Sequence, residues 1–474
     1  MIKLSNNIIF LVNKLQLKKT IIINNVLNYP FIFNEKDKTY LYYRTDSNKP
    51  KPEHEITKRY IINNFFDIID DFDFNLSLGI ANHNFRLFNF NNIKYGIGGQ
   101  SLLINNYNLF LNTNNVSYKN FNNNVKFLEN KYYGINHNFG NKFIDPVIYC
   151  PYYGNGLYLF EFQNDNYTEL TKYPIISGIK EGRHDGHYGF CDNKNLEKSK
   201  YGLSVFDSNT SILYNENNEN YYLYQRANIG CGIRHIQYCS SKDLINWSDF
   251  KLLYLKPRDD IFNFNIYYNN FFKLDDIDLF IGILPVNKKI NSKYSGVDSI
   301  ENYELYYSED CINWTSIGIL DTHEYYKNWI AIGKPIIKDN DYFFYTYNDN
   351  NKSIDIFDIP KNRFGYFTND NKNLKSNINL KLLFIKSNMI NINMTIIEGG
   401  YLKVQLKDKN KNIIEGYSFD DFIKIEGFID EYDYILKWNN NLELLDKEVY
   451  IEIEGINFNL YSINNKLMYE GLLV

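Results

Sequence analysis

The chain alternates short hydrophobic runs with polar stretches along nearly its whole length. Runs such as "KTYLYYR", "YYLYQR" and "YFFYTY" are rich in aromatic residues, and stretches rich in Asn, Asp, Lys and Gly separate them. This alternation is typical of many short antiparallel strands. Segments with helical periodicity are scarce, and residues 56–72 are the best candidate for a helix. The pattern therefore predicts an all-β protein.

A repeating unit organises these runs. Each unit begins with an unusual strand head, continues through an Asn/Asp-rich turn and enters a Tyr-rich strand. A tandem unit of about four strands is typical of a propeller blade. We expect five blades, whose first strands begin in residues 28–44, 82–99, 206–226, 261–284 and 328–347.

The pattern changes from about residue 375. Apolar and polar residues then alternate one by one, as in "EVYIEIEGINF", which is typical of half-buried sandwich strands. We therefore expect residues 1–370 to form a five-bladed β-propeller with an insertion at about 110–200, and residues 371–474 to form a small β-sandwich.

Several stretches together resemble one known group of proteins. They are the octets "SSKDLINW" (240–247) and "YSEDCINW" (307–314), the segment "VFDSNTSILYNENNENYYLYQR", "RFGYF" and the C-terminal "GGYLKVQLKDKNKNIIEGYS". In these motifs the chain resembles the five-bladed propeller glycoside hydrolases of families 32 and 43, with a C-terminal β-sandwich. Those enzymes cleave fructosides, arabinosides and related sugars. The resemblance covers about residues 28–465.

The resemblance also implies a role for the two octets, which contain two of the four tryptophans. In such propellers the pattern closes a blade on its outer strand. The Asp accepts backbone N–H bonds within a turn, and the Trp packs between neighbouring blades. We therefore expect Asp243 and Asp310 to be structural rather than catalytic.

Charge and cysteine content narrow the classes of partner. The net charge is −5 without a long basic block, so we expect no nucleic acid partner. The five cysteines are widely spaced, which favours reduced thiols over a disulfide framework or a zinc site. The apolar run near the N-terminus has five residues, too few for a signal peptide or a membrane span. We expect a soluble protein without membrane insertion and without a cofactor.

Glycoside hydrolysis usually requires two carboxylates across the scissile bond, one as acid and the other as nucleophile or base. The resemblance implies that such acids lie at the heads of the innermost strands. Asp207 in "VFDSN" has this place in the third blade and is a candidate for catalysis. In the first and fourth blades, Tyr29 and Asn263 or Asn265 stand where acids are expected.

The loop "KEGRHDGHYGF" is the richest in ionisable groups and precedes the third blade. Its Glu181 and Asp185 are candidates for catalysis, and its His184 and His187 are candidates for substrate binding. A His-x-x-His pair can bind a metal ion, but no third ligand has a supporting spacing, so we expect no metal site.

Other candidates for substrate binding are polar residues at strand heads or on adjacent strands. They are His83, Asn84, Arg86, Arg44, Arg226 and Arg234. The arginines suit a carboxylate of the substrate or of the protein, and buried structural ion pairs are the alternative. In the C-terminal region, Trp438 is the aromatic residue to test for sugar contact.

We therefore expect a glycoside hydrolase-like protein that acts on a carbohydrate bound in the central funnel of the propeller. Asp207 would orient the sugar or stabilise the oxocarbenium-like charge, and Glu181, Asp185 or the pair Asp259 and Asp260 would transfer protons. The alternative is a catalytically inactive propeller that binds carbohydrate or has a structural role. The missing acids of the first and fourth blades favour this alternative, because Asn cannot act as nucleophile or general acid.

Overall fold

The computed structural model consists almost entirely of β-strands, which confirms the all-β prediction; the described residues contain one short 3-10 helix, η1 (Gly79–Asn82). The residues that the structure describes are 2–3, 7–23, 27–35, 38–46, 55–63, 66–99, 103–104, 138–139, 142–143, 148–149, 156–170, 175–177, 179–180, 183–184, 209–230, 233–248, 250–256, 264–266, 268–274, 279–288, 300–320, 329–331, 333–348, 351–385, 389–439, 444, 447–464 and 466–468.

The helix predicted for residues 56–72 is wrong. The segment forms β6 (Glu55–Ile62) and β7 (Ile68–Leu76), which pair with each other. Between them, Asn63 Oδ1 accepts a hydrogen bond from the backbone N of Asp67 at 2.8 Å. An Asn side chain that bonds to nearby backbone groups competes with helix formation and favours a turn. Strand partners on both sides of β6 then override the weak helical pattern.

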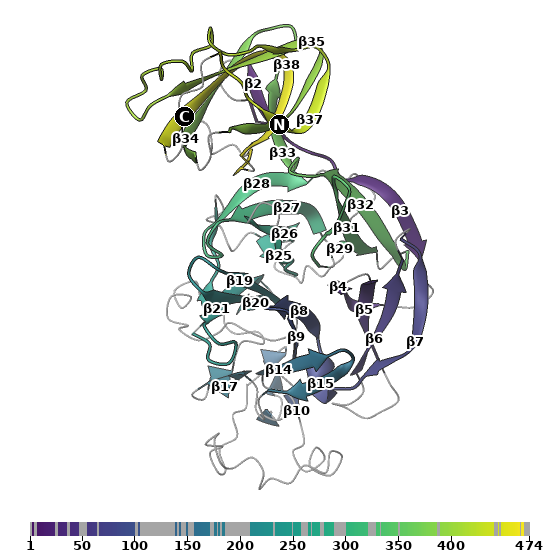
Figure 1. The fold of residues 1–474 in the computed structure, drawn as a ribbon. Coiled ribbons are helices and arrows are strands. Elements are labelled where there is room, and N and C mark those ends of the chain that lie inside the picture. The colour runs from purple at the N-terminus through teal and green to yellow at the C-terminus, as the bar shows by residue number, and fades with distance from the viewer. Residues whose placement is uncertain are drawn as a thin grey trace.

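Five mainly antiparallel sheets form the five blades of a propeller (Figure 1). From the inner to the outer strand, blade one consists of β4 (Asn28–Glu35), β5 (Lys38–Asp46), β6 and β7, and blade two of β8 (Arg86–Phe90), β9 (Ile93–Gly98), β14 (Gly156–Gln163) and β15 (Asn166–Glu169). Blade three consists of β19 (Ser211–Asn215), β20 (Asn220–Gly230), β21 (Ile233–Ser241) and β22 (Lys251–Leu252), and blade four of β24 (Phe264–Ile266) with β25 (Phe271–Leu274), β26 (Leu279–Lys288), β27 (Ile300–Ser308), β28 (Trp314–Leu320) and β23 (Leu255–Lys256). Blade five consists of β29 (Trp329–Ala331) with β30 (Ile336–Lys338), β31 (Asp341–Asn348), β32 (Ser353–Pro360) and β3 (Gln16–Ile22).

The chain between β9 and β19 also contains short strands. They are β10 (Leu103–Ile104), β11 (Asn138–Phe139), β12 (Lys142–Phe143), β13 (Ile148–Tyr149), β16 (Ile176–Ser177), β17 (Ile179–Lys180) and β18 (Arg183–His184).

The N-terminal strand β3 closes the ring of blades. It pairs antiparallel with β32, so the outermost strand of blade five precedes blade one in the sequence. Ile23, at the end of β3, is buried in a cluster that contains Leu41 of blade one and Ile354 of blade five. The closure therefore combines a strand ladder with a shared apolar core.

The remaining strands form one nine-stranded sheet that makes the C-terminal unit, drawn at the top of Figure 1. Its strands are β1 (Ile2–Lys3), β2 (Ile8–Val12), β33 (Gly365–Asn369), β34 (Ser376–Ile385), β35 (Asn391–Lys407), β36 (Ile425–Glu426), β37 (Ile429–Ile435), β38 (Lys447–Ile463) and β39 (Lys466–Leu467).

The long strands β35 and β38 bend together and fold this sheet over its own core. Their register shifts between Ile396 and Tyr401. Gly399 has a φ of 77°, and a Cβ atom on Gly400 would lie 2.6 Å from the carbonyl oxygen of Asn457. Only glycine fits so close an approach of two backbones, so this pair of glycines permits the bend.

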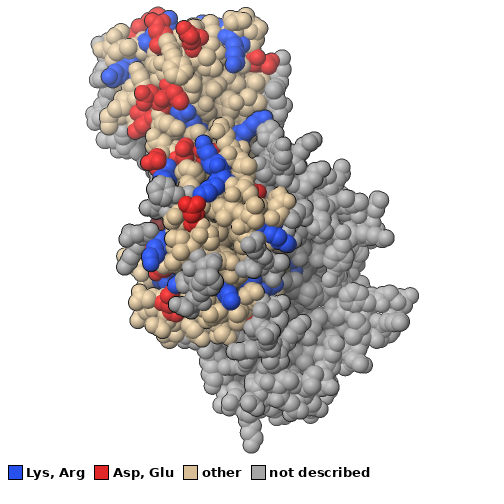
Figure 2. Space-filling model, turned by 90° about the vertical axis from the view of Figure 1, so that its right-hand side faces the viewer, with Lys and Arg blue, Asp and Glu red and all other residues tan. Residues whose placement is uncertain are grey.

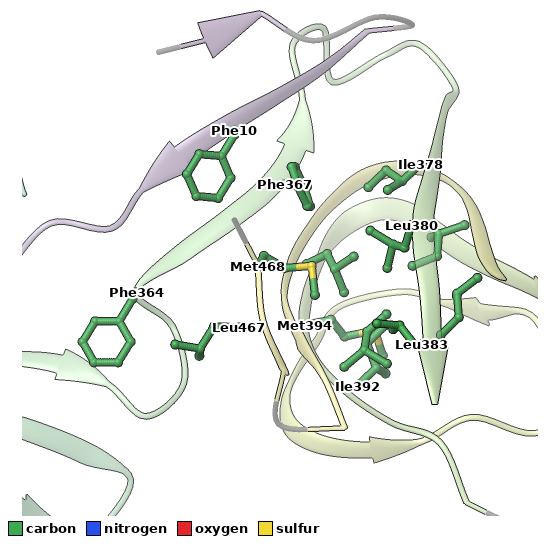
Figure 3. Close-up of a cluster of buried hydrophobic side chains, with 14 of the residues drawn as sticks. Phe10, Phe364, Phe367, Ile378, Leu380, Leu383, Ile392, Met394, Leu467 and Met468 are labelled. Atoms are coloured by element: carbon green, nitrogen blue, oxygen red, sulfur yellow. The ribbon is translucent and has the colours of Figure 1, made fainter. Parts of the chain in front are cut away.

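The C-terminal unit and the propeller share one apolar core. Phe10 of β2 contacts Phe367 with ring centroids 5.4 Å apart, and Phe364 stacks on Tyr342 of blade five at 5.4 Å. Figure 3 shows part of this buried cluster, with Phe10, Phe364, Phe367 and Leu467 among its labelled side chains. Because β2 belongs to the C-terminal sheet and β3 to blade five, both ends of the propeller chain enter this unit.

The octets have the structural role that was predicted for them. Asp310 Oδ1 accepts hydrogen bonds from the backbone N of Ile312 at 2.8 Å and of Asn313 at 2.7 Å, and from Ser308 Oγ at 3.0 Å. The Asp243 turn repeats these bonds residue for residue. Each octet links the third strand of its blade to the fourth.

The two tryptophans pack between blades, as predicted. Trp314 is fully buried, with its ring 4.5 Å from that of Phe271 in its own blade four and 5.8 Å from that of Tyr224 in blade three. Trp247 is half-buried against a cluster that contains Leu159 of blade two and Leu223 of blade three. The octet Trp therefore fills the apolar wedge between adjacent blades.

Trp438 does not have the exposure that a sugar platform requires. It is 5% exposed, packs against Tyr417 and Phe422, and donates from Nε1 to the carbonyl oxygen of Val404 at 3.2 Å. The hypothesis of a sugar contact at this residue is wrong, because the side chain belongs to the core of the C-terminal sheet.

Candidate functional site in the propeller funnel

Side chains at the heads of the inner strands join neighbouring blades around a central space, which we call the funnel. Asn269 Nδ2, before β25, donates to the carbonyl oxygen of Asn209, before β19, at 2.7 Å, and Asn209 Nδ2 donates back to the carbonyl oxygen of Asn269. Asn270 and Gly333 form a similar exchange at 3.2 and 3.1 Å between blades four and five. These bonds satisfy buried polar groups where the strand ladders begin.

Where blades one and two meet, ionisable and polar groups gather in a set that we call the funnel cluster: Tyr29, Arg44, Glu55, His83 and Asn84. Arg44 Nη1 lies 2.7 Å from His83 Nδ1 and 3.4 Å from Asn84 Oδ1. Glu55 Oε2 lies 3.0 Å from His83 Nδ1, and Glu55 Oε1 lies 3.4 Å from Arg44 Nη1. A carboxylate, a guanidinium and an imidazole therefore share one site.

The position of the proton on the His83 ring decides whether Nδ1 bonds to Glu55 or to Arg44. Nδ1 is within hydrogen-bonding distance of both Glu55 and Arg44. A ring nitrogen that carries a proton donates, and one without a proton accepts. A proton on Nδ1 therefore bonds His83 to Glu55, whereas a bare Nδ1 accepts from Arg44.

The backbone around the cluster is held by a second layer of bonds. Asn82 Nδ2 donates to the carbonyl oxygen of Glu55 at 3.0 Å, and Asn82 Oδ1 accepts from Thr57 Oγ1 at 3.0 Å. Asn84 has a φ of 54°, a left-handed conformation that Asn tolerates better than most residues. This geometry turns the chain from η1 into β8 and directs His83 and Asn84 toward blade one.

Tyr29 brings an aromatic ring to the head of β4, where the resemblance predicted an acid. Its φ of 48° is unusual for a bulky residue and costs about 1–3 kcal/mol, a strain often found at functional sites. The ring centroid lies 4.8 Å from Arg44 Cζ, 6.3 Å from the His83 ring and 5.7 Å from the ring of Tyr268 in blade four. Arg44 keeps 14% side-chain exposure and Tyr29 is half-buried, so a ligand can reach both.

Arg86, the first residue of β8, lies at the wall of a central cavity of about 530 Å³. The inner segments of all five blades line this cavity, with Phe31, Arg86, Thr210, Phe271 and Lys334 each from a different blade. Arg86 is 8% exposed, and burial lowers the pKa of its guanidinium to about 9. Its Cζ atom lies 5.0 Å from the centroid of the Phe31 ring.

Six of the eleven residues that the sequence nominated for catalysis or substrate binding have side chains outside the described residues. The side chains that lie outside the described residues are those of Asp207, Asp185, Glu181, His187, His184 and Arg234. Asn263, Asp259 and Asp260 are also outside them. Their suggested roles stay predictions.

Of the nominated residues with described side chains, Arg44, His83 and Asn84 come together in the funnel cluster. Arg86 lies at the cavity wall, on the strand that follows Asn84. Arg226 is 2% exposed on β20, where its backbone carbonyl accepts from Gln237 Nε2 at 3.2 Å.

Sequence reasoning missed Glu55. It begins β6 in the unremarkable segment "KPEHEITK", and 28 residues separate it from His83. No local pattern connects the two side chains, because their contact exists only once blades one and two stand side by side. A Glu at a strand start was the available signal, and it is weak.

Among the described residues, no group of three or more His, Cys, Asp or Glu side chains is arranged to hold a metal ion. No helix in the described part of the chain is long and apolar enough to cross a membrane. Figure 2 shows Lys and Arg interspersed with Asp and Glu over the described surface of one face.

No protein-family model and no curated protein matches this sequence. Similar solved structures exist. One, named only as a glycoside hydrolase, is 11% identical with a TM-score of 0.39, over 73% of this chain and 93% of that chain. An endo-arabinase from Bacteroides thetaiotaomicron is 12% identical with a TM-score of 0.38, over 71% and 94%. A Bombyx mori GH32 β-fructofuranosidase is 10% identical with a TM-score of 0.37, over 95% and 93%. The five-bladed architecture of this chain rests on its own sheet topology.

Proposed function

We propose that this protein binds a carbohydrate in the funnel and acts on it as a glycoside hydrolase. The observation that carries the proposal is the funnel cluster, in which a carboxylate, an imidazole and a guanidinium meet beside an aromatic ring at the heads of two inner strands. Small-molecule sites typically combine apolar or aromatic walls with a few convergent polar groups that fix orientation.

The chemistry of the cluster suits a sugar. Arg44 offers N–H donors and Asn84 offers both donors and acceptors, which match the hydroxyl groups of a sugar ring. Tyr29 presents a partly exposed aromatic ring, which packs against the buried ring of Tyr268 at 5.7 Å. Such rings pack against the apolar C–H face of a sugar while their hydroxyl groups remain available for hydrogen bonds.

In this proposal Glu55 and His83 form the proton-transfer pair. A carboxylate oxygen of Glu55 lies 3.0 Å from Nδ1 and orients the ring, and imidazole is the side chain that most often acts as a general acid or base. We propose Asp207 as the second carboxylate, because glycoside hydrolysis needs two. Asp185 and Glu181 stay alternative proton donors.

The test is turnover by the full-length protein on a panel of chromogenic glycosides and polysaccharides. Because general acid–base catalysis contributes about 10²–10⁴-fold, we expect Glu55→Gln to lower kcat/KM at least about 100-fold, and Asp207→Asn to abolish turnover. Glu35→Gln is the matched control: Glu35 ends the same inner strand whose head carries Tyr29, and it pairs with Lys94 at 2.9 Å. Wild-type turnover in both Glu55→Gln and Asp207→Asn would refute the proposed roles.

One observation favours a second function, carbohydrate binding without hydrolysis. In the funnel cluster the carboxylate comes from Glu55 alone, and that carboxylate is paired with Arg44. Glycoside hydrolysis usually needs two carboxylates across the scissile bond. Calorimetric binding of a sugar that the protein does not cleave, lost in Arg44→Met, would establish this function in place of the first.

A further inference from the structure

Arg86 is a buried cation whose charge no described residue balances. Its side chain is more than nine-tenths buried. Its Nε atom has no hydrogen-bond partner, and among the residues that the structure describes no carboxylate pairs with its guanidinium. The ring of Phe31, whose centroid is 5.0 Å from Cζ, offsets only part of the cost of removing the charge from water.

This charge persists at neutral pH. Burial is the cause of the lowered pKa of Arg86, and at a pKa of about 9 the guanidinium is still about 99% protonated at pH 7. A buried charge is normally paired, because an unpaired one carries a large desolvation penalty. Among the described residues, no side chain supplies the partner that this charge requires.

The space in front of Arg86 is large enough to hold that partner. The central cavity of about 530 Å³ is within the usual range of small-molecule sites. Three cationic residues line it among the described residues, Arg86, Lys273 and Lys334, against one acidic residue, Glu216. Since Glu216 pairs with Lys273, it does not neutralise Arg86.

We propose that the central cavity is a binding site for an oxyanion, which Arg86 holds through its guanidinium. The planar guanidinium fits carboxylate, sulfate and phosphate groups through two parallel N–H···O bonds. The oxyanion is either the carboxylate of a sugar acid or a free inorganic ion. The proposal does not depend on hydrolysis, and its test measures binding rather than turnover.

The experiment titrates the full-length protein with sodium glucuronate, glucose, sodium sulfate and sodium phosphate, with sodium chloride keeping the ionic strength constant. Binding is followed by calorimetry and by thermal unfolding. At an anion concentration about 100 times Kd, we expect the unfolding temperature to rise by about 2–3 °C. Binding of glucuronate alone identifies a sugar acid, and binding of sulfate or phosphate identifies a free oxyanion.

Variants then assign the binding to Arg86. We expect Arg86→Met to fold, to unfold at the wild-type temperature or above it without anion, and to weaken anion binding at least tenfold. Arg86→Lys keeps the charge without the two-bond geometry and should bind with intermediate affinity. Arg59→Met is the control, because Arg59 is also buried but pairs with Asp165 at 2.7 Å. Failure of every anion to stabilise the wild-type protein beyond chloride, or equal binding by Arg86→Met, overturns the proposal.

Discussion

Replacing Trp314 by alanine tests the wedge between blades three and four. The side chain is fully buried, with Phe271 at 4.5 Å and Tyr224 at 5.8 Å between ring centroids. A buried aromatic side chain removes about 150–250 Å² from water, which at about 25 cal/mol per Å² corresponds to roughly 4–6 kcal/mol. Measured Trp→Ala and Phe→Ala losses of about 3–5 kcal/mol agree with the lower part of that range. We therefore expect Trp314→Ala to lower the free energy of unfolding by about 4 kcal/mol.

Trp247 supplies a matched comparison within the same protein. It occupies the same position of the other octet and makes the same Nε1 bond, to the carbonyl oxygen of Leu244 at 2.8 Å, but it is only half-buried. We expect Trp247→Ala to cost about 1–2 kcal/mol, because roughly half of the area is at stake. Trp314→Phe keeps a ring against Phe271 and should cost less than Trp314→Ala.

The assay is guanidinium chloride unfolding followed by far-UV circular dichroism, since tryptophan fluorescence changes with the substitution itself. The midpoint should fall clearly more for Trp314→Ala than for Trp247→Ala, at an unchanged slope. Equal losses for the two variants, or a loss below about 1 kcal/mol for Trp314→Ala, would show that burial of the octet Trp does not hold adjacent blades together.

Three further predictions concern other parts of the propeller. Hydrogen bonds from backbone N–H groups lower the pKa of Asp243 to about 2, below its ordinary value of 3.8, so the stabilisation by this carboxylate is present above about pH 4 and lost as the pH falls toward 2. Asp243→Asn should therefore lower the free energy of unfolding at pH 7 by about 1 kcal/mol after allowing for solvent exposure, and its unfolding temperature should converge with that of the wild type near pH 2. Gly333→Ala should destabilise by about 2 kcal/mol in urea unfolding, because Gly333 has a φ of 112° and a Cβ atom would lie 3.0 Å from the carbonyl oxygen of Ile32; a neutral result would mean that the inner strands separate easily. Ile23→Ala should lower the free energy of unfolding by about 3 kcal/mol in thermal unfolding, because Ile23 is 5% exposed at the ring closure. The control Ile22→Ala replaces a residue that is 76% exposed and should change stability little. Equal effects of the two substitutions would contradict the closure described for β3.

The parts of the fold that were predictable depend on short-range bonds. In the octets, Asp310 bonds groups two and three residues away, so the same letters produce the same turn wherever they occur. The five blade starts were readable for a similar reason, since a strand–turn–strand unit carries its own alternation and turn residues. All five have a β-strand within the predicted segment.

Errors arose where a neighbour in space overrides a local pattern. Residues 56–72 have a weak helical period, but β5 and β7 offer β6 a strand partner on each side. Trp438 is followed by a run of Asn residues, yet Tyr417, Phe422 and the backbone of β35 enclose it. In both cases the free energy comes from long-range pairing and burial, which no window of the sequence contains.

The same distinction between local pattern and spatial contact applies to the candidate site. The sequence by itself determined which polar residues stand at strand heads, and it nominated His83, Asn84 and Arg86 from a single seven-residue stretch. Only the tertiary structure decided that Glu55 meets His83 at 3.0 Å, while no described carboxylate pairs with Arg86 at the cavity wall. The physical reason is that charge–charge pairing depends on distance in space, and the ring of blades sets that distance through contacts between strands far apart in the chain.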